Sequence, residues 1–303
     1  MQTSTITSPS LTNPNHRPEG SPMALDELLS ALQTAQNQTW QSDETTNSEY
    51  LTTEEVHSQR YTAQKSSTVH FLMGETGGMG KSVAASWLAQ SLYGRGHALT
   101  VVDADPNNDS LSRFKALSAE RFRILNDDDE FDVQAMDMFV DRMMESPNDF
   151  IIDCGASGFI ALASYLKRES VIDFIAESGK NVCVHTFVVG GDRQDKTIEL
   201  AKAFLDQMPT EVQLVLWINP KFGKPRHEEQ FSAYFANRGV YIVRIPDVHA
   251  GSAGKNVDYM LENKLTFDEA INSAELSGLS KQRLSSFWRK LSASIDAAVE
   301  CGA

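Results

Sequence analysis

The sequence predicts an α/β fold: a mostly parallel, twisted sheet with helices on both faces. Short, almost uninterrupted apolar runs are typical of strands buried on both sides, and segments with helical periodicity separate these runs along the chain. The predicted strands are Val69–Met73, Leu99–Asp103, Phe150–Asp153, Val182–Val189, Val212–Asn219 and Val240–Ile245. The predicted helices are Lys81–Arg95, Asp132–Glu145, Gly158–Ser178, Asp192–Gln207, Arg226–Asn237 and Leu279–Val299.

The composition limits the partners that this fold can have. The chain has 303 residues, 41% of them hydrophobic, which is enough for a large core. It carries 41 Asp and Glu against 27 Lys and Arg, a formal net charge of −14. Nucleic acid would be repelled by most of such a surface, so any non-specific DNA contact needs a local basic patch. The basic residues near the last predicted helix are Lys281, Arg283, Arg289 and Lys290.

The cysteines and the hydropathy pattern favour a cytoplasmic protein. Cys154, Cys183 and Cys301 are far apart and odd in number, so they form neither a disulfide framework nor a zinc spacing. We expect Cys154 to be a small buried residue beside the sheet, and His70 and His185, within apolar strands, to be core residues rather than ligands. No apolar run reaches the length of a membrane span, so we expect no integral membrane insertion.

The chain divides into a tail at 1–66 and a folded domain at 67–303. The tail is rich in Ser, Thr, Asn and Gln, which bury too little apolar surface to offset chain entropy, and we expect it to be disordered. Within it, residues 23–33 place four leucines at helical spacing. This short helix either docks a partner, such as a cargo or adaptor protein, or forms transiently without a role.

A glycine-rich loop follows the first predicted strand and leads into a helix. Glycines let successive backbone N–H groups turn toward phosphate oxygens, and the helix N-terminus adds its positive dipole end. Lys81 would reach the β- and γ-phosphates, and the Ser82 hydroxyl would hold Mg²⁺. The loop therefore predicts a site for ATP or ADP with Mg²⁺. Its binding residues are Gly77, Gly78, Met79, Gly80, Lys81, Ser82 and Val83.

Carboxylates stand at the ends of two further predicted strands. Asp103 and Asp105 lie two residues apart after the second strand, an arrangement that suits a cation-bound water and its activation. Asp153 ends the apolar strand Phe150–Asp153, as in a Walker B motif, where the carboxylate holds Mg²⁺ through water. The sequence thus predicts Ser82, Asp103 and Asp153 as metal-site residues.

These motifs resemble the ParA/MinD family of P-loop ATPases. Thr76–Ser82 matches the family's deviant loop, Lys-Gly-Gly-x-Gly-Lys-Ser/Thr, at six of seven places; Thr76 replaces the signature lysine. The resemblance implies that Asp105 positions or activates the attacking water. It also implies that Asn219 hydrogen-bonds adenine, although Asn219 is alternatively an ordinary turn residue, and that the loop around Pro246 packs beside the base.

The resemblance implies an ATPase that dimerises with nucleotide and positions, partitions or transfers a plasmid or other cargo. The stretches Asp153–Ile160 and Val184–Gly191 resemble a plasmid-associated branch concerned with conjugal transfer, mobilisation or maintenance. In the family the signature lysine contacts the partner's phosphates, so its loss implies slow turnover or a cation from elsewhere, with Arg193 and Lys221 as candidates. One alternative is a nucleotide-gated binding module with negligible hydrolysis. Another is a metabolic enzyme of the same superfamily.

Overall fold

The computed structural model describes residues 67–156, 158–168, 170–209, 212–247 and 253–299. The predicted tail and its helix at 23–33 lie outside the described residues. In the described chain, a single sheet of seven parallel strands has the order β3-β2-β4-β1-β5-β6-β7, which confirms the predicted fold class. The strands are β1 (Thr68–Leu72), β2 (Leu99–Asp103), β3 (Glu120–Arg121), β4 (Asp149–Asp153), β5 (Asn181–Val189), β6 (Gln213–Asn219) and β7 (Tyr241–Arg244).

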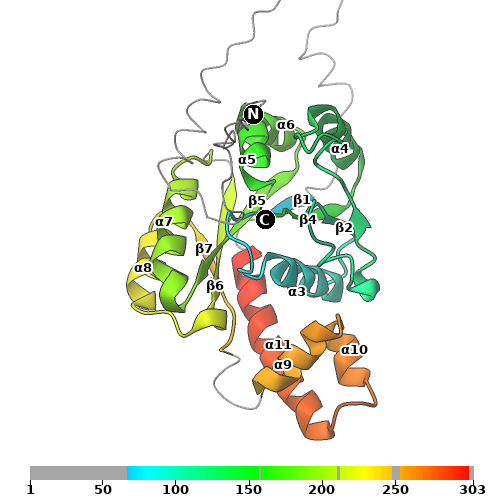
Figure 1. Ribbon diagram of the computed structural model, residues 1–303, viewed down its shortest axis with the longest axis vertical. Coiled ribbons are helices and arrows are strands. Elements are labelled where there is room, and N and C mark those ends of the chain that lie inside the picture. Colours follow the sequence, from blue (N-terminus) through cyan, green and yellow to red (C-terminus); the bar gives the residue numbers. More distant parts are fainter. Residues whose placement is uncertain (1–66, 157, 169, 210–211, 248–252, 300–303) are drawn as a thin grey trace, which may run out of the picture.

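Helices cover both faces of the sheet (Figure 1). The α-helices are α3 (Lys81–Gly94), α4 (Val133–Glu145), α5 (Phe159–Arg168), α6 (Val171–Glu177), α7 (Gln194–Leu205), α8 (Glu228–Ala236), α9 (Ala253–Glu262), α10 (Phe267–Asn272) and α11 (Gly278–Val299). Three 3₁₀ helices join them: η1 (Lys115–Leu117), η2 (Gly191–Arg193) and η3 (Pro220–Phe222).

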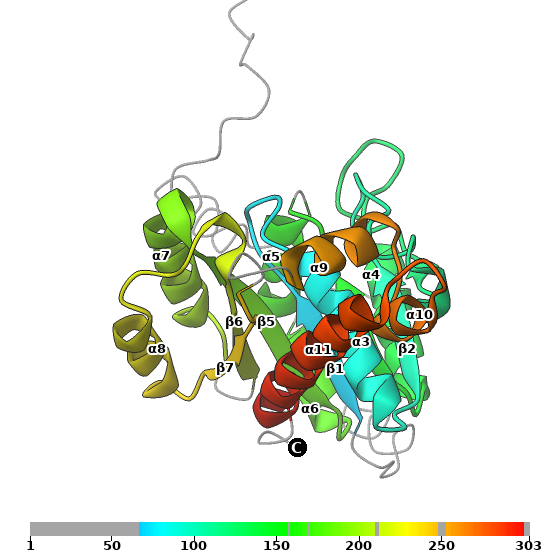
Figure 2. The same ribbon diagram turned by 90° about the horizontal axis from the view of Figure 1, so that it is seen from below.

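The two faces carry separate apolar cores. Side chains from α4 to α8 pack on one face, whereas α3, α9, α10 and α11 pack on the other. Figure 2 shows α11 running beside α3, with α9 and α10 next to them. One face of α11 is apolar and buried at Leu284, Phe287, Leu291 and Ile295, so this helix is part of the core. None of the helices that the structure describes is long and apolar enough to cross a membrane.

The structure differs from the sequence prediction in three places. The predicted helix Gly158–Ser178 is two helices, α5 and α6, because Ser170 before α6 has a left-handed backbone with φ of 49°. The edge strand β3 has only two residues, which is too short for a periodicity signal. Helices α9 and α10 were not predicted; a capping box between Thr266 and Glu269 starts α10.

A chain of hydrogen bonds joins four buried side chains under the α3 face. The Trp217 Nε1–H donates to His185 Nδ1 at 2.9 Å, and His185 Nε2 lies 3.0 Å from His70 Nδ1 and 3.3 Å from Cys183 Sγ. Since Nδ1 of a neutral His185 accepts from Trp217, its proton must sit on Nε2 and point at His70 or Cys183. Nε2 then has no lone pair to offer a metal, and the cluster works as a satisfied core network.

We predict that this network makes stability fall with acidification. Burial lowers the pKa of His70 from 6.5 to about 4 and the pKa of His185 well below its usual value. Between pH 6.5 and about 4 these histidines bind more protons in the unfolded chain than in the folded one, so their contribution to the free energy of unfolding decreases as pH falls, by roughly 3 kcal/mol for His70 alone. Urea denaturation of wild type and of a His70 variant at pH 4.5 to 7.5 isolates this contribution, because the buried Asp153 carboxyl, whose pKa is raised to about 7, acts with the opposite sign in the same range.

The replacement His70→Asn should lower the slope of the unfolding free energy against pH relative to wild type, whereas His227→Asn, at an exposed histidine with φ of 52° that asparagine tolerates, should leave it unchanged. Equal slopes for His70→Asn and wild type would contradict the prediction.

Candidate nucleotide site

The phosphate loop connects β1 to α3 and owes its shape to two glycines. Gly78 and Gly80 have φ of 76° and 96°, a left-handed conformation that other residues reach only with strain. Gly80 is the N-cap of α3, so the loop turns straight into the N-terminus of the helix. The first backbone N–H groups of a helix lack intrahelical partners, which makes this end of α3 suitable for an anion.

Lys81, the first residue of α3, folds back over the loop. Its Nζ donates to the Thr76 carbonyl oxygen at 3.3 Å, and the residue is only 7% exposed. Burial lowers the pKa of Lys81, while the Asp153 and Asp105 carboxylates act in the opposite direction. Thr76 itself thus meets Lys81 through its backbone.

Asn219 braces the loop from the end of β6. Its Nδ2 donates to the Met79 carbonyl oxygen at 2.9 Å, and its Oδ1 accepts from the Lys221 backbone N–H at 3.0 Å. A Cβ added at Gly80 would lie 2.8 Å from Asn219 Nδ2, so glycine is needed for this close approach. The resemblance implies an adenine contact for Asn219, with an ordinary turn residue as the alternative. Neither predicts the contact with Met79, which joins residues 140 positions apart.

The strand register brings two predicted metal-site carboxylates side by side. Asp103 at the end of β2 pairs with Asp153 at the end of β4, and Asp153 pairs on its other side with Leu72. Asp103 is fully buried and already has protein partners: its Oδ2 accepts from the Ser112 N–H at 2.9 Å, and Arg121 lies 3.4 Å from its Oδ1. These contacts fix the segment that follows β2.

Asp153 is buried without a hydrogen-bond partner for either carboxylate oxygen in the described structure. Its pKa is raised to about 7, mainly by burial, with the nearby Asp103 and Asp105 carboxylates acting in the same direction. The Ser82 hydroxyl, short of good hydrogen-bond geometry, and Lys81 act in the opposite direction. A buried carboxylate of this kind is stabilised by a cation or a proton. Asp153 and Ser82 therefore fit a divalent cation that prefers oxygen ligands.

Asp105 caps the segment that follows it and contacts the segment after β4. Its Oδ1 accepts from the backbone N–H groups of Asn107 and Asn108 at 2.9 and 3.2 Å, and its Oδ2 accepts from Asn108 Nδ2 at 3.2 Å. A Cβ added at Gly155 would lie 2.5 Å from Asp105 Cγ. Only glycine at position 155 lets the two segments meet this closely.

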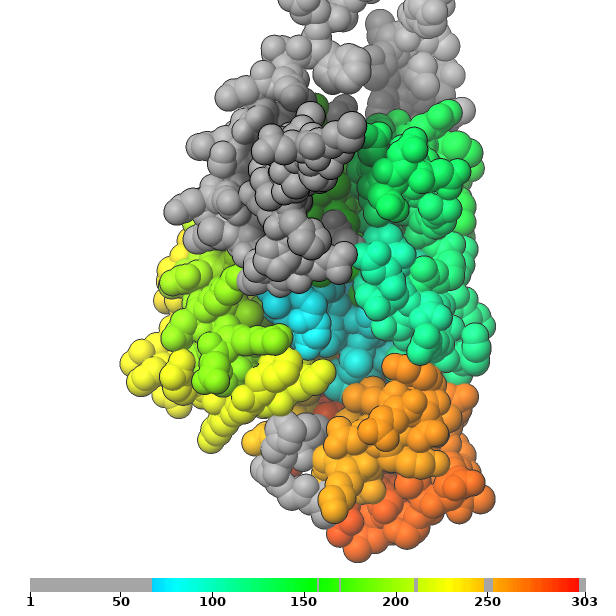
Figure 3. Space-filling model, viewed as in Figure 1, coloured from blue at the N-terminus to red at the C-terminus, as the bar shows by residue number. Residues whose placement is uncertain are grey.

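A cavity of about 350 Å³ opens in front of the phosphate loop. Figure 3 shows this part of the surface, where α9 and α10 (orange) lie beside the phosphate-loop region (blue to cyan). Asn219, Pro246, Asp103 and Asp153 do not line the cavity, and neither does Arg193, whose guanidinium lies 4.8 Å from the centre of the Phe222 ring. The lining residues are Gly77, Gly78, Gly80, Lys81, Ser82, Val83, Asp105, Asn107, Asn108, Ser110, Phe114, Ala156, Lys221 and Lys264.

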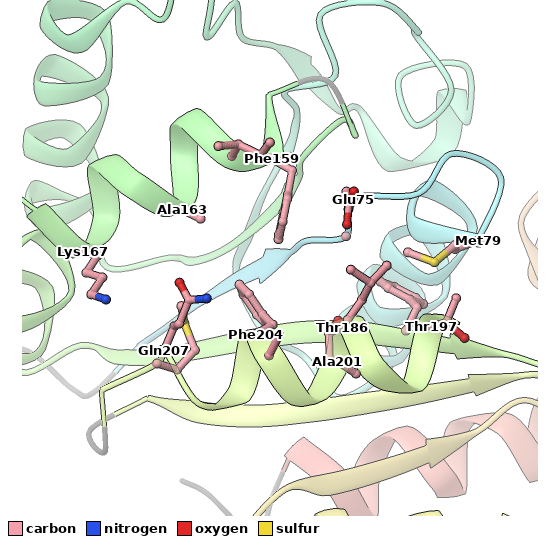
Figure 4. A pocket seen from close by; sticks show the side chains of 16 residues that line it. Glu75, Met79, Phe159, Ala163, Lys167, Thr186, Thr197, Ala201, Phe204 and Gln207 are labelled. Atoms are coloured by element: carbon pink, nitrogen blue, oxygen red, sulfur yellow. The ribbon is translucent and has the colours of Figure 1, made fainter. Parts of the chain in front are cut away.

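A second, small apolar cavity of about 40 Å³ lies between α5 and α7, on the other side of the loop. Figure 4 shows Glu75 and Met79 at one end of it, and Lys167 and Gln207 at the other. The buried Oε2 of Glu75 has no hydrogen-bond partner in the described chain, and burial raises the pKa of this carboxyl although Lys196 opposes the shift. Glu75 stands where a strict phosphate loop has glycine, and its side chain lines this apolar cavity.

Comparison with known proteins agrees with this architecture. Residues 71–253 match the model of the CobQ/CobB/MinD/ParA nucleotide binding domain. The chain is 34% identical over 222 residues to a protein from Escherichia coli named Protein TraL, covering 71% of this chain and 92% of that protein. A second Escherichia coli Protein TraL is 33% identical over 236 residues, covering 76% and 98% respectively.

Among solved structures, a plasmid partition protein from Borrelia burgdorferi superposes with a TM-score of 0.44 at 14% identity, over 65% of this chain and 97% of that one. The assignment rests on the domain match and on the two TraL sequences. The chain belongs to the CobQ/CobB/MinD/ParA family of nucleotide-binding domains.

Proposed function

We propose that the protein is an ATPase of the ParA/MinD kind that uses Mg²⁺ and switches between states with its nucleotide. The observation that carries this proposal is that the phosphate loop holds Lys81 and that the buried Asp153 carboxylate has no hydrogen-bond partner among the described residues. An ammonium suits the terminal phosphates and a carboxylate suits the cation that accompanies them, so the two groups fit a single ligand, Mg²⁺-ATP.

In the proposed reaction the chain mainly positions charges. The loop N–H groups bind phosphate oxygens, and Lys81 exchanges its hydrogen bond to Thr76 for one to the phosphates. Ser82 and Asp153 hold Mg²⁺, which when bound neutralises phosphate charge. Asp105 orients the attacking water after releasing part of its contact with Asn107 and Asn108.

The proposed switch lies where Asp105 meets Gly155. Because these segments are in contact, a change at the phosphates that moves Asp105 must also move the residues after β4. We propose that this motion controls a homodimer and its cargo or adaptor protein in the cytoplasm, with the tail at 1–66 as a docking segment. The resemblance of Asp153–Ile160 and Val184–Gly191 to a plasmid-associated branch favours a plasmid-associated cargo, and α11 offers basic residues for DNA contact.

A nucleotide-gated binding module with negligible hydrolysis is the second candidate. It is favoured by Asp105, both of whose oxygens are engaged in capping the segment after β2, and by Thr76 in place of the signature lysine. Single-turnover hydrolysis measured alone and with DNA separates the two candidates.

We predict that Lys81→Ala weakens ATP binding at least about tenfold, because a buried charge-assisted contact with the phosphates is lost. Titration with a fluorescent ATP analogue measures this affinity. Lys255→Ala, at an exposed lysine on α9 outside the cavity, is the matched control and should bind as wild type does. Unchanged affinity in Lys81→Ala would refute the assignment of the loop.

We predict that Asp105→Asn keeps ATP binding but slows single-turnover hydrolysis by about 10²- to 10⁴-fold, since the amide oxygen can still accept from the Asn107 and Asn108 N–H groups but the charge that activates water is lost. Asp105→Ala should be as slow and should also loosen the segment after β2. Hydrolysis at the wild-type rate in both variants would remove Asp105 from the mechanism and favour another water-positioning group.

The contact between Asp105 and Gly155 gives a prediction of its own. Gly155→Ala should lower the free energy of unfolding by about 1–3 kcal/mol, because a methyl group 2.5 Å from Asp105 Cγ forces one segment away. Gly94→Ala, at a helical glycine with open space around it, should instead be neutral or stabilising by up to about 1 kcal/mol. Urea denaturation compares the two, and equal stability would show that the contact yields without cost.

A further inference from the structure

We propose that Lys264 is a nucleotide-binding residue that supplies, from within its own chain, a cation for the phosphates at the candidate site. The proposal rests on the proposed nucleotide-binding function and names a residue of that site which the sequence did not indicate. Three observations carry it: the place of Lys264 in the cavity, its backbone conformation, and the charge balance around it.

Lys264 lines the cavity from a segment far along the chain from the phosphate loop. It lies between α9 and α10, yet it lines the same cavity as Lys81 and the phosphate loop. In Figure 3 the orange α9–α10 region borders the phosphate-loop region directly. The segment is held firmly because Phe267, the first residue of α10, packs against Trp87 of α3 with ring centroids 6.4 Å apart. Lys264 is therefore positioned by the same helix that carries Lys81.

The backbone at Lys264 is left-handed, with φ of 55°. The residue follows the C-terminus of α9, and the next residue, Leu265, donates its N–H to the Met260 carbonyl oxygen at 2.9 Å. Helices commonly end in this way, but usually with glycine at the left-handed position, since other side chains are strained there. A lysine that occupies the glycine position points to a use for its side chain.

The charged side chains that line the cavity favour an anion. Among the described lining residues, the three lysines Lys81, Lys221 and Lys264 face a single carboxylate, that of Asp105. The Lys264 ammonium lies 5.4 Å from the centre of the Phe114 ring, but Phe114 is only 1% exposed and its face is not open for a base to stack on it. Phosphate oxygens rather than a base are thus the partner that suits the Lys264 ammonium.

Thr76 in the loop is neutral, and among the described lining residues the loop itself brings one cation, Lys81, to the cavity. Lys264 would add a second positive charge from elsewhere in the same chain. Lys221, which the sequence did indicate, lines the same cavity and lies 5.5 Å from the Phe222 ring centre. Arg193 does not line it, so among the described residues Lys221 and Lys264 are the lining cations besides Lys81.

The test compares three variants of the full chain. Lys264→Met removes the charge with little change in length, Lys264→Arg keeps the charge, and Lys264→Gly removes both the charge and the backbone strain. Lys255→Met, on α9 but outside the cavity, is the control. Each is titrated with fluorescent ATP and ADP analogues at several KCl concentrations, and thermal unfolding without nucleotide is recorded in parallel.

We expect Lys264→Met and Lys264→Gly to bind ATP about tenfold more weakly and with a shallower salt dependence, while Lys264→Arg and Lys255→Met stay within about twofold of wild type. A loss confined to ATP assigns the contact to the γ-phosphate, and an equal loss for ADP assigns it to the α- or β-phosphate. Lys264→Gly should unfold at the wild-type temperature or above it, because glycine adopts this backbone freely.

If Lys264→Gly binds ATP weakly but unfolds at the wild-type temperature or above it, Lys264 contacts the ligand and does not act only through the stability of the fold. Wild-type affinity in both Lys264→Met and Lys264→Gly would overturn the inference, as would weak binding that accompanies a lower unfolding temperature in all three variants. If the wild type itself bound no ATP, the proposed function would fail instead. The two failures are therefore distinguishable.

Discussion

The parallel register of β1, β4 and β2 brings three strand ends to one level of the sheet, with Leu72 beside Asp153 and Asp153 beside Asp103. Every other feature of the site depends on this alignment. It places the phosphate loop, which begins just after Leu72, directly above two carboxylates. The helices that cover both faces exclude water from this level, so the charges interact more strongly than they would at a surface.

Charges buried at this level must be balanced, and the structure balances them unequally. Asp103 has Arg121 and the Ser112 N–H, whereas Asp153 has no hydrogen-bond partner among the described residues. Lys81 donates its hydrogen bond to the Thr76 carbonyl oxygen and acts on the Asp153 carboxylate only through its charge. The Asp103 carboxylate thus has partners within the fold, whereas its neighbour Asp153 has none among the described residues. This division of roles between adjacent, chemically identical groups comes entirely from their surroundings.

How much the sequence can predict depends on whether a feature is local. The phosphate loop and the acidic strand ends are local, because glycine spacing and a strand followed by a carboxylate carry their own signals. Asn219 was singled out as the end of a strand, but its contact with Met79 follows only from the packing of β6 near β1. Lys264 had no signal at all: it sits in an unremarkable polar turn, and only the docking of α10 on α3 gives it a place at the cavity. The break between α5 and α6 was missed for a different reason, since the apolar periodicity continues across Ser170.

The place of α11 in the chain has a consequence for how the protein is made. This helix covers the α3 face and contacts β7, yet it follows all seven strands in the described sequence. During synthesis the sheet and α3 therefore leave the ribosome before α11, the helix that covers them. Their apolar surface stays exposed until α11 has been made, at about 5–20 residues per second. During this interval the exposed apolar surface of the nascent chain can bind chaperones. The phosphate loop is also synthesised before α9 and α10, which lie on either side of the cavity-lining residue Lys264.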